Sequence, residues 1–184
     1  MKYLIVLIVM LCTVQLVSSQ KYFSKTGKIA FHSDAPMEKI EATNTTASTV
    51  LDASTGNYEW AVLIQGFKFD KSLMQEHFNE NYMESGTYPK AKFKGKVDNI
   101  SSVNFKKDGD YPVNVSGQME IHGVTKPVSS TGVITVKGGS ISAKSDMTIL
   151  IADYGIVIPK LVADNIAKTV DIKVQADYQM MPAN

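Results

Sequence analysis

Apolar and polar residues alternate along most of the chain between residues 109 and 178. Residues 111–121 and 141–151 carry their apolar side chains largely on odd positions, and residues 170–178 carry them on even positions, with polar residues between. Successive side chains of a β-strand point to opposite faces of the sheet. The alternation therefore predicts long strands that are buried on one face and solvated on the other.

The first part of the chain predicts further strands. Residues 22–33 form one strand that places Phe23 and Ile29 on the same face, and residues 38–52, rich in Thr, Ser and Ala, form one or two more. The segment 58–67 is apolar on both parities. We expect it to be a strand covered on both sides.

One segment breaks the alternating pattern. From Asp70 to Met83, apolar residues recur every three or four positions. This spacing predicts a helix of about three turns, with Asp70 as its N-terminal cap. Residues 90–97 then return to alternation, with a lysine at every even position. We interpret this lysine face as a solvated surface that discourages edge-to-edge aggregation.

The resulting order is about eight strands, mostly joined by short connections, with one inserted helix. His122-Gly123 and Gly138-Gly139 mark two hairpin turns. We predict an all-β fold, an eight-stranded antiparallel barrel with one inserted α-helix, in a single domain over residues 20–184. A barrel of this size either encloses one small ligand or is filled by its own side chains.

Residues 1–19 have the features of a secretory signal peptide. Lys2 gives a charged start, residues 3–17 are almost entirely apolar, and small residues follow. We expect cleavage after Ser19, no stable membrane span, and a periplasmic or secreted protein; a retained anchor is the less favoured alternative. Cleavage also removes Cys12, the only cysteine, so the mature chain forms no disulfide.

Charge and motif content argue against several function classes. All 19 basic residues are lysines, so the bidentate arginine contacts typical of nucleic-acid binding are absent, and we expect no nucleic-acid partner. No metal-binding spacing connects His32, His77 and His122, and the chain has no Gly-x-Ser-x-Gly motif. We therefore expect no metal, no cofactor and no catalysis, and assign the histidines structural roles.

Three motifs carry a resemblance to a known family. Tyr88-Pro89, the segment GQMEIHGVTKPV over residues 117–128, and Asp153-Tyr154-Gly155-Ile156 occur in this order. Together they resemble the YceI-like family of exported bacterial proteins over essentially the whole mature chain. The resemblance implies a lipocalin-like antiparallel barrel whose interior holds a long polyisoprenoid or similar amphiphilic lipid, usually in the periplasm.

One segment departs from the family pattern. Where many members resemble Arg-Asp-x-His-Leu at the start of the helical segment, this chain has SLMQEHF over residues 72–78. It keeps a histidine and lacks the arginine. A head group recognised through that arginine is therefore not expected to be held in the same way here.

A lipid site needs a sleeve of apolar side chains and an exit for a polar head group. Strand parity directs one set of side chains inward, and Tyr154 is a candidate gate at the exit, although Gly155 beside it also indicates a simple turn. The alternative is that the inward side chains only pack against one another. The candidate ligand-binding residues are Phe31, Trp60, Val62, Ile64, Phe67, Phe78, Phe93, Val115, Met119, Ile134, Met147, Ile149, Tyr154, Ile172 and Val174.

The energetics of chain burial favour long ligands. Each buried methylene contributes roughly 0.8 kcal/mol, against an association cost of about 4 to 15 kcal/mol, so roughly fifteen buried carbons are needed for tight binding. We predict an exported protein that encloses a long-chain isoprenoid or fatty amphiphile for carriage or sequestration. The alternative is a ligand-free exported barrel that acts as a stress-response or interaction module. The sequence leaves open whether two barrels pair as a homodimer.

Overall fold

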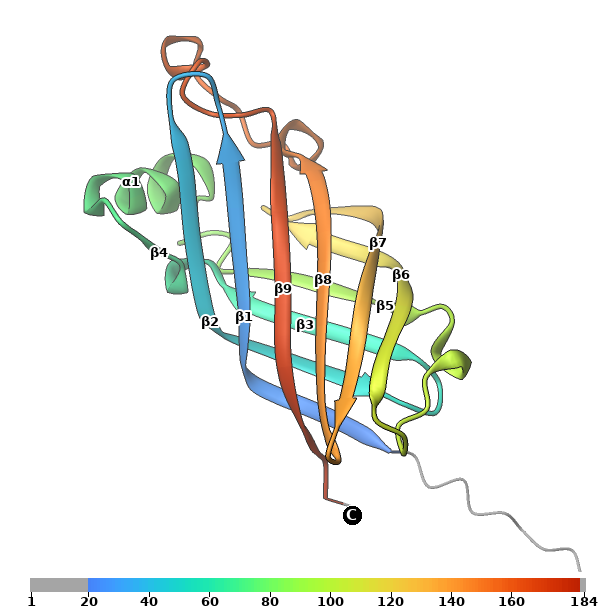
Figure 1. Cartoon of the computed structure of the whole chain (residues 1–184). Coiled ribbons are helices and arrows are strands. Elements are labelled where there is room, and N and C mark those ends of the chain that lie inside the picture. The colour runs from blue at the N-terminus through green and yellow to red at the C-terminus, as the bar shows by residue number, and fades with distance from the viewer. Residues whose placement is uncertain (1–19, 183–184) are drawn as a thin grey trace, which may run out of the picture.

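Nine strands and several short helical segments make up residues 20–182, the part of the chain that this computed structural model describes (Figure 1). The predicted signal peptide lies outside the described residues. The strands are β1 (Lys21–Asp34), β2 (Lys39–Asp52), β3 (Asn57–Leu63), β4 (Lys68–Phe69), β5 (Lys90–Val97), β6 (Gly109–Ile121), β7 (Val124–Lys137), β8 (Ser140–Leu150) and β9 (Thr169–Met180).

Eight of these strands close into an antiparallel barrel. Their order is β1-β9-β8-β7-β6-β5-β3-β2, and β2 pairs back with β1 from Lys21↔Asp52 to Asp34↔Lys39. The two-residue β4 pairs with Ala42 and Thr43 of β2, on the strand edge away from β1. This closure confirms the predicted all-β, lipocalin-like barrel with one inserted helix, and it pairs strands that would otherwise present long open edges.

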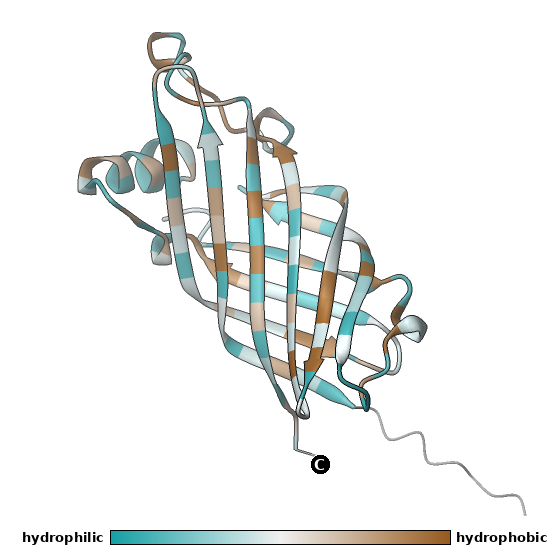
Figure 2. Cartoon of the chain, in the orientation of Figure 1, coloured by the Kyte–Doolittle hydropathy of each residue, from teal (hydrophilic) through white to brown (hydrophobic). Residues whose placement is uncertain are grey.

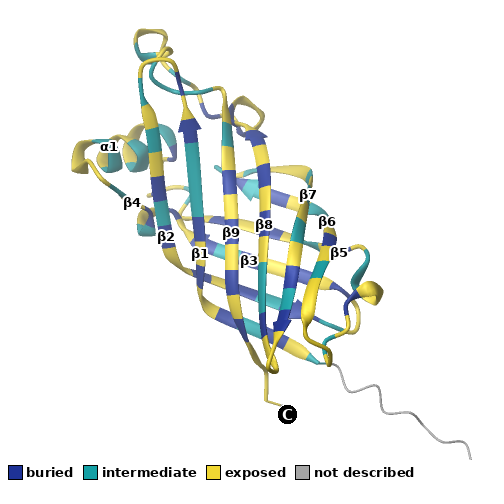
Figure 3. Cartoon of the chain, in the orientation of Figure 1, coloured by how far each residue is buried: buried dark blue, intermediate teal, exposed yellow. Residues whose placement is uncertain are grey.

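Burial follows hydropathy along the strands, as a comparison of Figures 2 and 3 shows. In β9, Ile172, Val174 and Ala176 are buried, and the residues between them are exposed. The apolar parity therefore points into the barrel, as half-buried strands require.

The prediction that residues 58–67 form one strand covered on both sides is wrong. β3 alternates cleanly and ends at Leu63, which is exposed, and Ile64–Gly66 form a 3-10 turn. The side-chain amide of Asn44 donates a 2.9 Å hydrogen bond to the Leu63 carbonyl. A Cβ on Gly66 would lie 2.3 Å from that amide nitrogen, so glycine permits the close approach. The turn directs Ile64 and Phe67 into the core, where Phe67 packs against Phe31 and Phe78.

The prediction that Phe23 and Ile29 share a face is also wrong. The register between β1 and β2 shifts between Ser24 and Ile29. Buried positions are even before the irregularity, as at Tyr22, and odd after it, as at Ile29. An irregularity that adds residues to one strand moves the following side chains to the opposite face.

The predicted helix is present as α1 (Ser72–His77), which continues into a π-helical turn over Phe78–Tyr82. Its capping was predicted incorrectly. Lys71 occupies the N-cap position and no side chain caps the helix, because the helix starts one residue too late for Asp70 to serve.

Aromatic contacts fix this helical segment to the barrel. The Phe78 ring lies 5.0 Å from Phe69 and 5.3 Å from Phe31, centroid to centroid, and 5.9 Å from Phe67. These separations are typical of favourable aromatic pairs. The helix therefore lies beside one end of the barrel (Figure 1).

The connection from β8 to β9 lies at this same end, which we call the open end. It contains 3-10 turns at Ile151–Tyr154 and Lys160–Val162. Its backbone meets the β1–β2 hairpin, where the Met37 amide donates to the Asp164 carbonyl (3.1 Å) and the Ala167 amide donates to Ser33 Oγ (3.0 Å). The C-terminal end of β9 and the β7–β8 hairpin lie at the opposite end, which we call the filled end (Figure 1).

The predicted hairpin turns are confirmed. His122 and Gly123 have φ of 52° and 73°, and Gly138 and Gly139 have φ of 55° and 80°. Two consecutive residues at positive φ give the turn type that matches the twist of antiparallel hairpins.

Candidate functional site

An apolar cavity of about 330 Å³, the mouth cavity, opens at the open end of the barrel. Three chain segments far apart in sequence surround it: the β1–β2 hairpin, the helical segment and the connection before β9. Its apolar lining residues are Phe31, Ile40, Phe69, Leu73, Met74, Phe78, Tyr82, Met83, Ile151, Ile156, Val162, Ile166 and Val170.

A second, entirely apolar-walled cavity of about 110 Å³, the inner cavity, lies deeper in the barrel. Phe31, Phe78 and Met83 are among the residues that line both cavities, so the two spaces adjoin. The open end therefore leads into the barrel along a continuous apolar surface. The remaining wall of the inner cavity is formed by residues such as Ile29, Trp60, Val62, Phe67, Ala91, Ile121, Ile149 and Ile172.

Polar groups gather at the rim of the mouth cavity. Lys71 Nζ lies 2.8 Å from Glu38 Oε1, and both residues line the cavity together with His77 and Asn165. The hydrogen bond from Lys71 lowers the pKa of the Glu38 carboxyl, and the same bond raises the pKa of Lys71. Both groups are thus charged at neutral pH, and the cavity ends in a polar, solvent-facing rim.

The opposite half of the barrel is filled by its own side chains. The Phe93 ring stacks on Trp60 at 6.1 Å and lies 5.7 Å from Tyr58. A Cβ on Gly117 would lie 2.6 Å from the Gly95 Cα and 2.7 Å from the Phe93 ring. The facing glycines therefore let the ring pack directly on the backbone. The space left beyond it is only about 20 Å³.

A buried polar cluster completes the filled end. Thr49 Oγ1 donates to the Glu59 carbonyl (2.9 Å) and lies 3.1 Å from the Tyr178 hydroxyl. Burial raises the pKa of both Tyr58 and Tyr178, and the proximity of the two tyrosines raises that of Tyr178 further. Both phenols stay neutral, and the cluster links β2, β3 and β9 across the interior.

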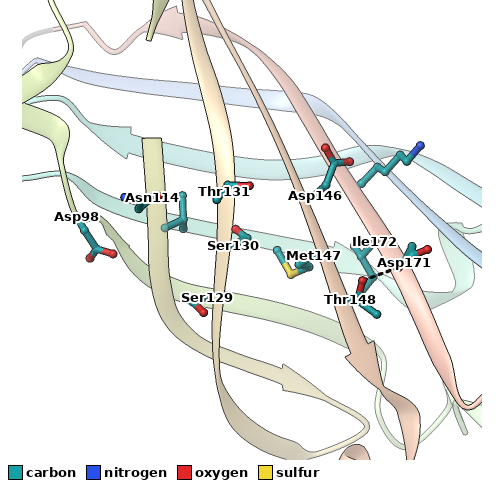
Figure 4. A pocket seen from close by; sticks show the side chains of 12 residues that line it. Asp98, Asn114, Ser129, Ser130, Thr131, Asp146, Met147, Thr148, Asp171 and Ile172 are labelled. Atoms are coloured by element: carbon teal, nitrogen blue, oxygen red, sulfur yellow. Dashed lines mark hydrogen bonds between the residues drawn. The ribbon is translucent and has the colours of Figure 1, made fainter. Parts of the chain in front are cut away.

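A polar groove of about 740 Å³, the side groove, runs along the barrel wall where β7 and β8 separate (Figure 4). The two strands pair only from Thr131↔Asp146 to Lys137↔Ser140. Thr148 Oγ1 donates to Asp171 at 2.5 Å inside the groove, while Ser130 Oγ is buried without a hydrogen-bond partner. The groove is lined mainly by hydroxyls and carboxylates, so it suits water better than a hydrocarbon chain.

The structure brings together only part of the predicted sleeve. Seven predicted residues line the inner cavity: Phe31, Trp60, Val62, Phe67, Phe78, Ile149 and Ile172. Three border the small space at the filled end, Val115, Ile134 and Val174, and Met147 lines the side groove. The other four are buried in packed regions and line none of these cavities: Ile64, Phe93, Met119 and Tyr154.

The mouth cavity contains residues that the sequence reasoning missed. Ile156, Val162 and Ile166 come from the β8–β9 connection, and Leu73 and Met74 come from the helix. The apolar run after Gly155 and the helical periodicity were visible signals. Neither signal, however, indicates which strands those segments lie against.

The three family-like motifs meet in space near Tyr154. Its carbonyl lies 3.2 Å from His122 Nδ1, and His122 Nε2 lies 2.8 Å from Glu84. The Tyr88 and His122 rings are 4.5 Å apart, and Gly155 takes the predicted positive φ of 70°. Tyr154 is therefore a buried anchor between the β8–β9 connection and the β6–β7 hairpin.

Within residues 20–182, no group of three or more His, Cys, Asp or Glu side chains is arranged to hold a metal ion. Over the same residues, no helix combines the length and the apolar character needed to cross a membrane.

Solved structures share this fold. A polyisoprenoid-binding domain from Saccharophagus degradans aligns with a TM-score of 0.75 at 17% identity, covering 89% of this chain and 99% of that domain. Burkholderia cenocepacia BcnA aligns with a TM-score of 0.67 at 16% identity, covering 83% and 96%. A Campylobacter jejuni YceI protein gives 0.54 at 15% identity, covering 77% and 85%.

No curated protein sequence matches the chain. The model of the YceI-like domain, in contrast, matches residues 18–178, which is most of the chain. This match and the shared fold agree with the motifs gathered around Tyr154. The protein therefore belongs to the YceI-like family.

Proposed function

We propose that this protein binds a long-chain amphiphilic lipid, isoprenoid or fatty, with the hydrocarbon chain in the mouth and inner cavities. The observation that carries this proposal is the continuous apolar surface that leads from the open end into the barrel. The mouth cavity's volume of about 330 Å³ falls within the roughly 300–1,000 Å³ typical of ligand sites. The Saccharophagus domain with the same fold is described as polyisoprenoid-binding, which supports a lipid of this class.

The position of the polar rim suggests the orientation of the ligand. The chain enters first and the head group stays near the Glu38–Lys71 pair, where His77 and Asn165 offer further hydrogen bonds. The filled end stops the chain, so the ligand enters and leaves through the same opening. Each buried methylene contributes roughly 0.8 kcal/mol, so a longer chain binds more tightly until the packing around Phe93 ends the passage.

The role that follows is binding for carriage or sequestration, without chemical conversion of the lipid. The signal-peptide pattern of residues 1–19 favours a periplasmic or secreted location. A protein there that shields a water-insoluble chain would move it through an aqueous space or keep it from other partners.

Native mass spectrometry tests the proposal. Protein expressed from the full chain and purified as the host processes it should carry, or take up on titration, a lipid of about twenty carbons. A ligand of about eight carbons should bind far more weakly. Equal affinity for both lengths, or a protein that takes up no lipid, would contradict the proposal.

A matched pair of variants locates the site. Ala91 lines the inner cavity, so Ala91→Phe should fill it and lower uptake of long chains, while Ala152→Phe, at an exposed position, should leave uptake unchanged. Circular dichroism and a thermal melt establish that both variants fold, since overpacking destabilises by about 1–3 kcal/mol.

The filled end favours one second candidate, a barrel without ligand that acts as an interaction module. Under that candidate the purified protein has its apo mass, and Ala91→Phe and Ala152→Phe behave alike in every lipid titration.

A further inference from the structure

Large apolar side chains project into solvent around the opening of the mouth cavity. Leu161 is 95% exposed, Val157 78%, Met37 73% and Leu73 61%. We call these four residues the apolar rim. Single exposed apolar residues are ordinary on protein surfaces, but a group at one end needs a physical reason.

The apolar rim comes from the three segments that surround the cavity. Met37 lies in the β1–β2 hairpin, Leu73 in α1, and Val157 and Leu161 in the β8–β9 connection. Hydrogen bonds hold two of these segments together, from the Met37 amide to Asp164 and from the Ala167 amide to Ser33. Most of the rim therefore belongs to segments that hydrogen bonds fix to one another at the open end.

Charges of both signs lie beside the rim, and two of its neighbouring lysines form ion pairs. Lys71 Nζ lies 2.8 Å from Glu38, and Lys39 Nζ lies 3.7 Å from Asp34. Lys160 and Lys168 share the β8–β9 connection with Asp153 and Asp164, so this end has no excess of positive charge and any contact that it makes depends mainly on its apolar side chains.

We propose that the open end docks on a lipid bilayer, with the apolar rim inserted at the level of the head groups. Separate apolar tips that surround a cavity suit a soft bilayer surface, which admits each tip independently. The bilayer that contacts the apolar rim is then also the source of the ligand. A lipid passes from it into the mouth cavity without crossing water. This inference rests on the proposed function and adds where the ligand is loaded.

The test measures binding to phosphatidylcholine vesicles and the rate of lipid uptake from them. The variant carries Val157→Ser and Leu161→Ser, because neither side chain lines the cavities. We expect its vesicle partitioning to fall about tenfold and its uptake rate from vesicles to fall in parallel. Wild-type partitioning should be nearly unchanged between 50 and 500 mM salt, as expected for apolar docking (screening lengths of roughly 14 to 4 Å).

A matched control carries Met180→Ser and Met181→Ser, two exposed apolar residues where β9 ends at the filled end. It should bind vesicles like the wild type. Equal losses in both variants, a requirement for anionic lipid, or a wild type that leaves vesicles unbound would overturn the proposal. So would sedimentation showing that the rim variant separates a dimer, because the rim would then be covered by a second copy of the chain.

Uptake of lipid delivered from cyclodextrin separates this inference from the proposed function. Normal uptake from cyclodextrin by the rim variant, with slow uptake from vesicles, supports docking. Uptake from cyclodextrin by a wild type that does not bind vesicles overturns docking alone. Uptake from neither source overturns the proposed function as well.

Discussion

The two ends of this barrel are built from the same alternating strands, yet one is hollow and the other is solid. At the filled end, paired glycines admit the Phe93 ring and a tyrosine–threonine cluster spans the interior, leaving about 20 Å³. At the open end, the interior is covered by a helix and two connections, and a cavity of about 330 Å³ remains. The comparison indicates that strands provide the framework of the barrel, while the segments between them determine where it is empty.

The largest expected effect tests whether stability resides in the filled end. Met119 is fully buried and pairs with Phe93 of the filled half, so Met119→Ala should lower the free energy of unfolding by about 2–5 kcal/mol. Met74, half-buried at the open end, provides the control, and Met74→Ala should cost under about 1 kcal/mol. Urea denaturation measures both; similar losses would mean that the two ends are equally packed.

The glycine contact at the filled end comes next. A methyl group on Gly117 would meet the Gly95 Cα at 2.6 Å and the Phe93 ring at 2.7 Å, so Gly117→Ala should destabilise by about 1–3 kcal/mol. Gly86 has no neighbour within 4 Å of the added atom, and Gly86→Ala should change the stability little. If thermal denaturation shows no difference between the two variants, the backbone at Gly117 has room that the structure does not indicate.

A smaller effect concerns alkaline pH. Burial raises the pKa of Tyr58 and Tyr178 above the ordinary value of 10.0. Their contribution to stability is therefore complete below about pH 10 and is lost as pH rises toward the folded-state values, because the unfolded chain ionises first. Urea denaturation between pH 8 and 11 should show this decline, and Tyr178→Phe should reduce it. An unchanged slope in the variant would exclude Tyr178 as a source.

The smallest expected effect lies at the open end. Glu38 and Lys71 form a solvent-exposed pair, so Glu38→Gln should leave the denaturation midpoint nearly unchanged between pH 5 and 8. The same variant should alter the relative affinity for lipids with charged and neutral head groups, measured by titration. A clear loss of stability would show that the Glu38–Lys71 pair supports the fold and is not available to contact a ligand.

Much of the fold was predictable because alternation reports directly which strand face is buried. Where it failed, a local irregularity intervened: a register shift in β1 separates Phe23 from Ile29, and the hydrogen bond from Asn44 ends β3 at Leu63. Neither feature leaves a clear trace in hydropathy, since both depend on partners distant in sequence.

The candidate site was less predictable for a related reason. Parity separates inside from outside but does not show which inward residues border a cavity, so Trp60, which lines the inner cavity, and Met119, which does not, have the same pattern. The position of Ile156 over the barrel depends on how its connection folds back. The sequence does not show how the connections between strands fold back over the barrel, and that path determines the lining of the mouth cavity.

The meeting of Tyr88, His122 and Tyr154 bears on how relatives of this protein should be recognised. These signature residues form a clasp on the outside of the lining, and none of them borders either apolar cavity. A shared clasp accordingly indicates the common fold, and its three residues do not line the space that we propose for the ligand. We expect relatives with the same clasp to differ in ligand where the helix and the apolar residues that follow Gly155 differ, because those residues line the mouth cavity.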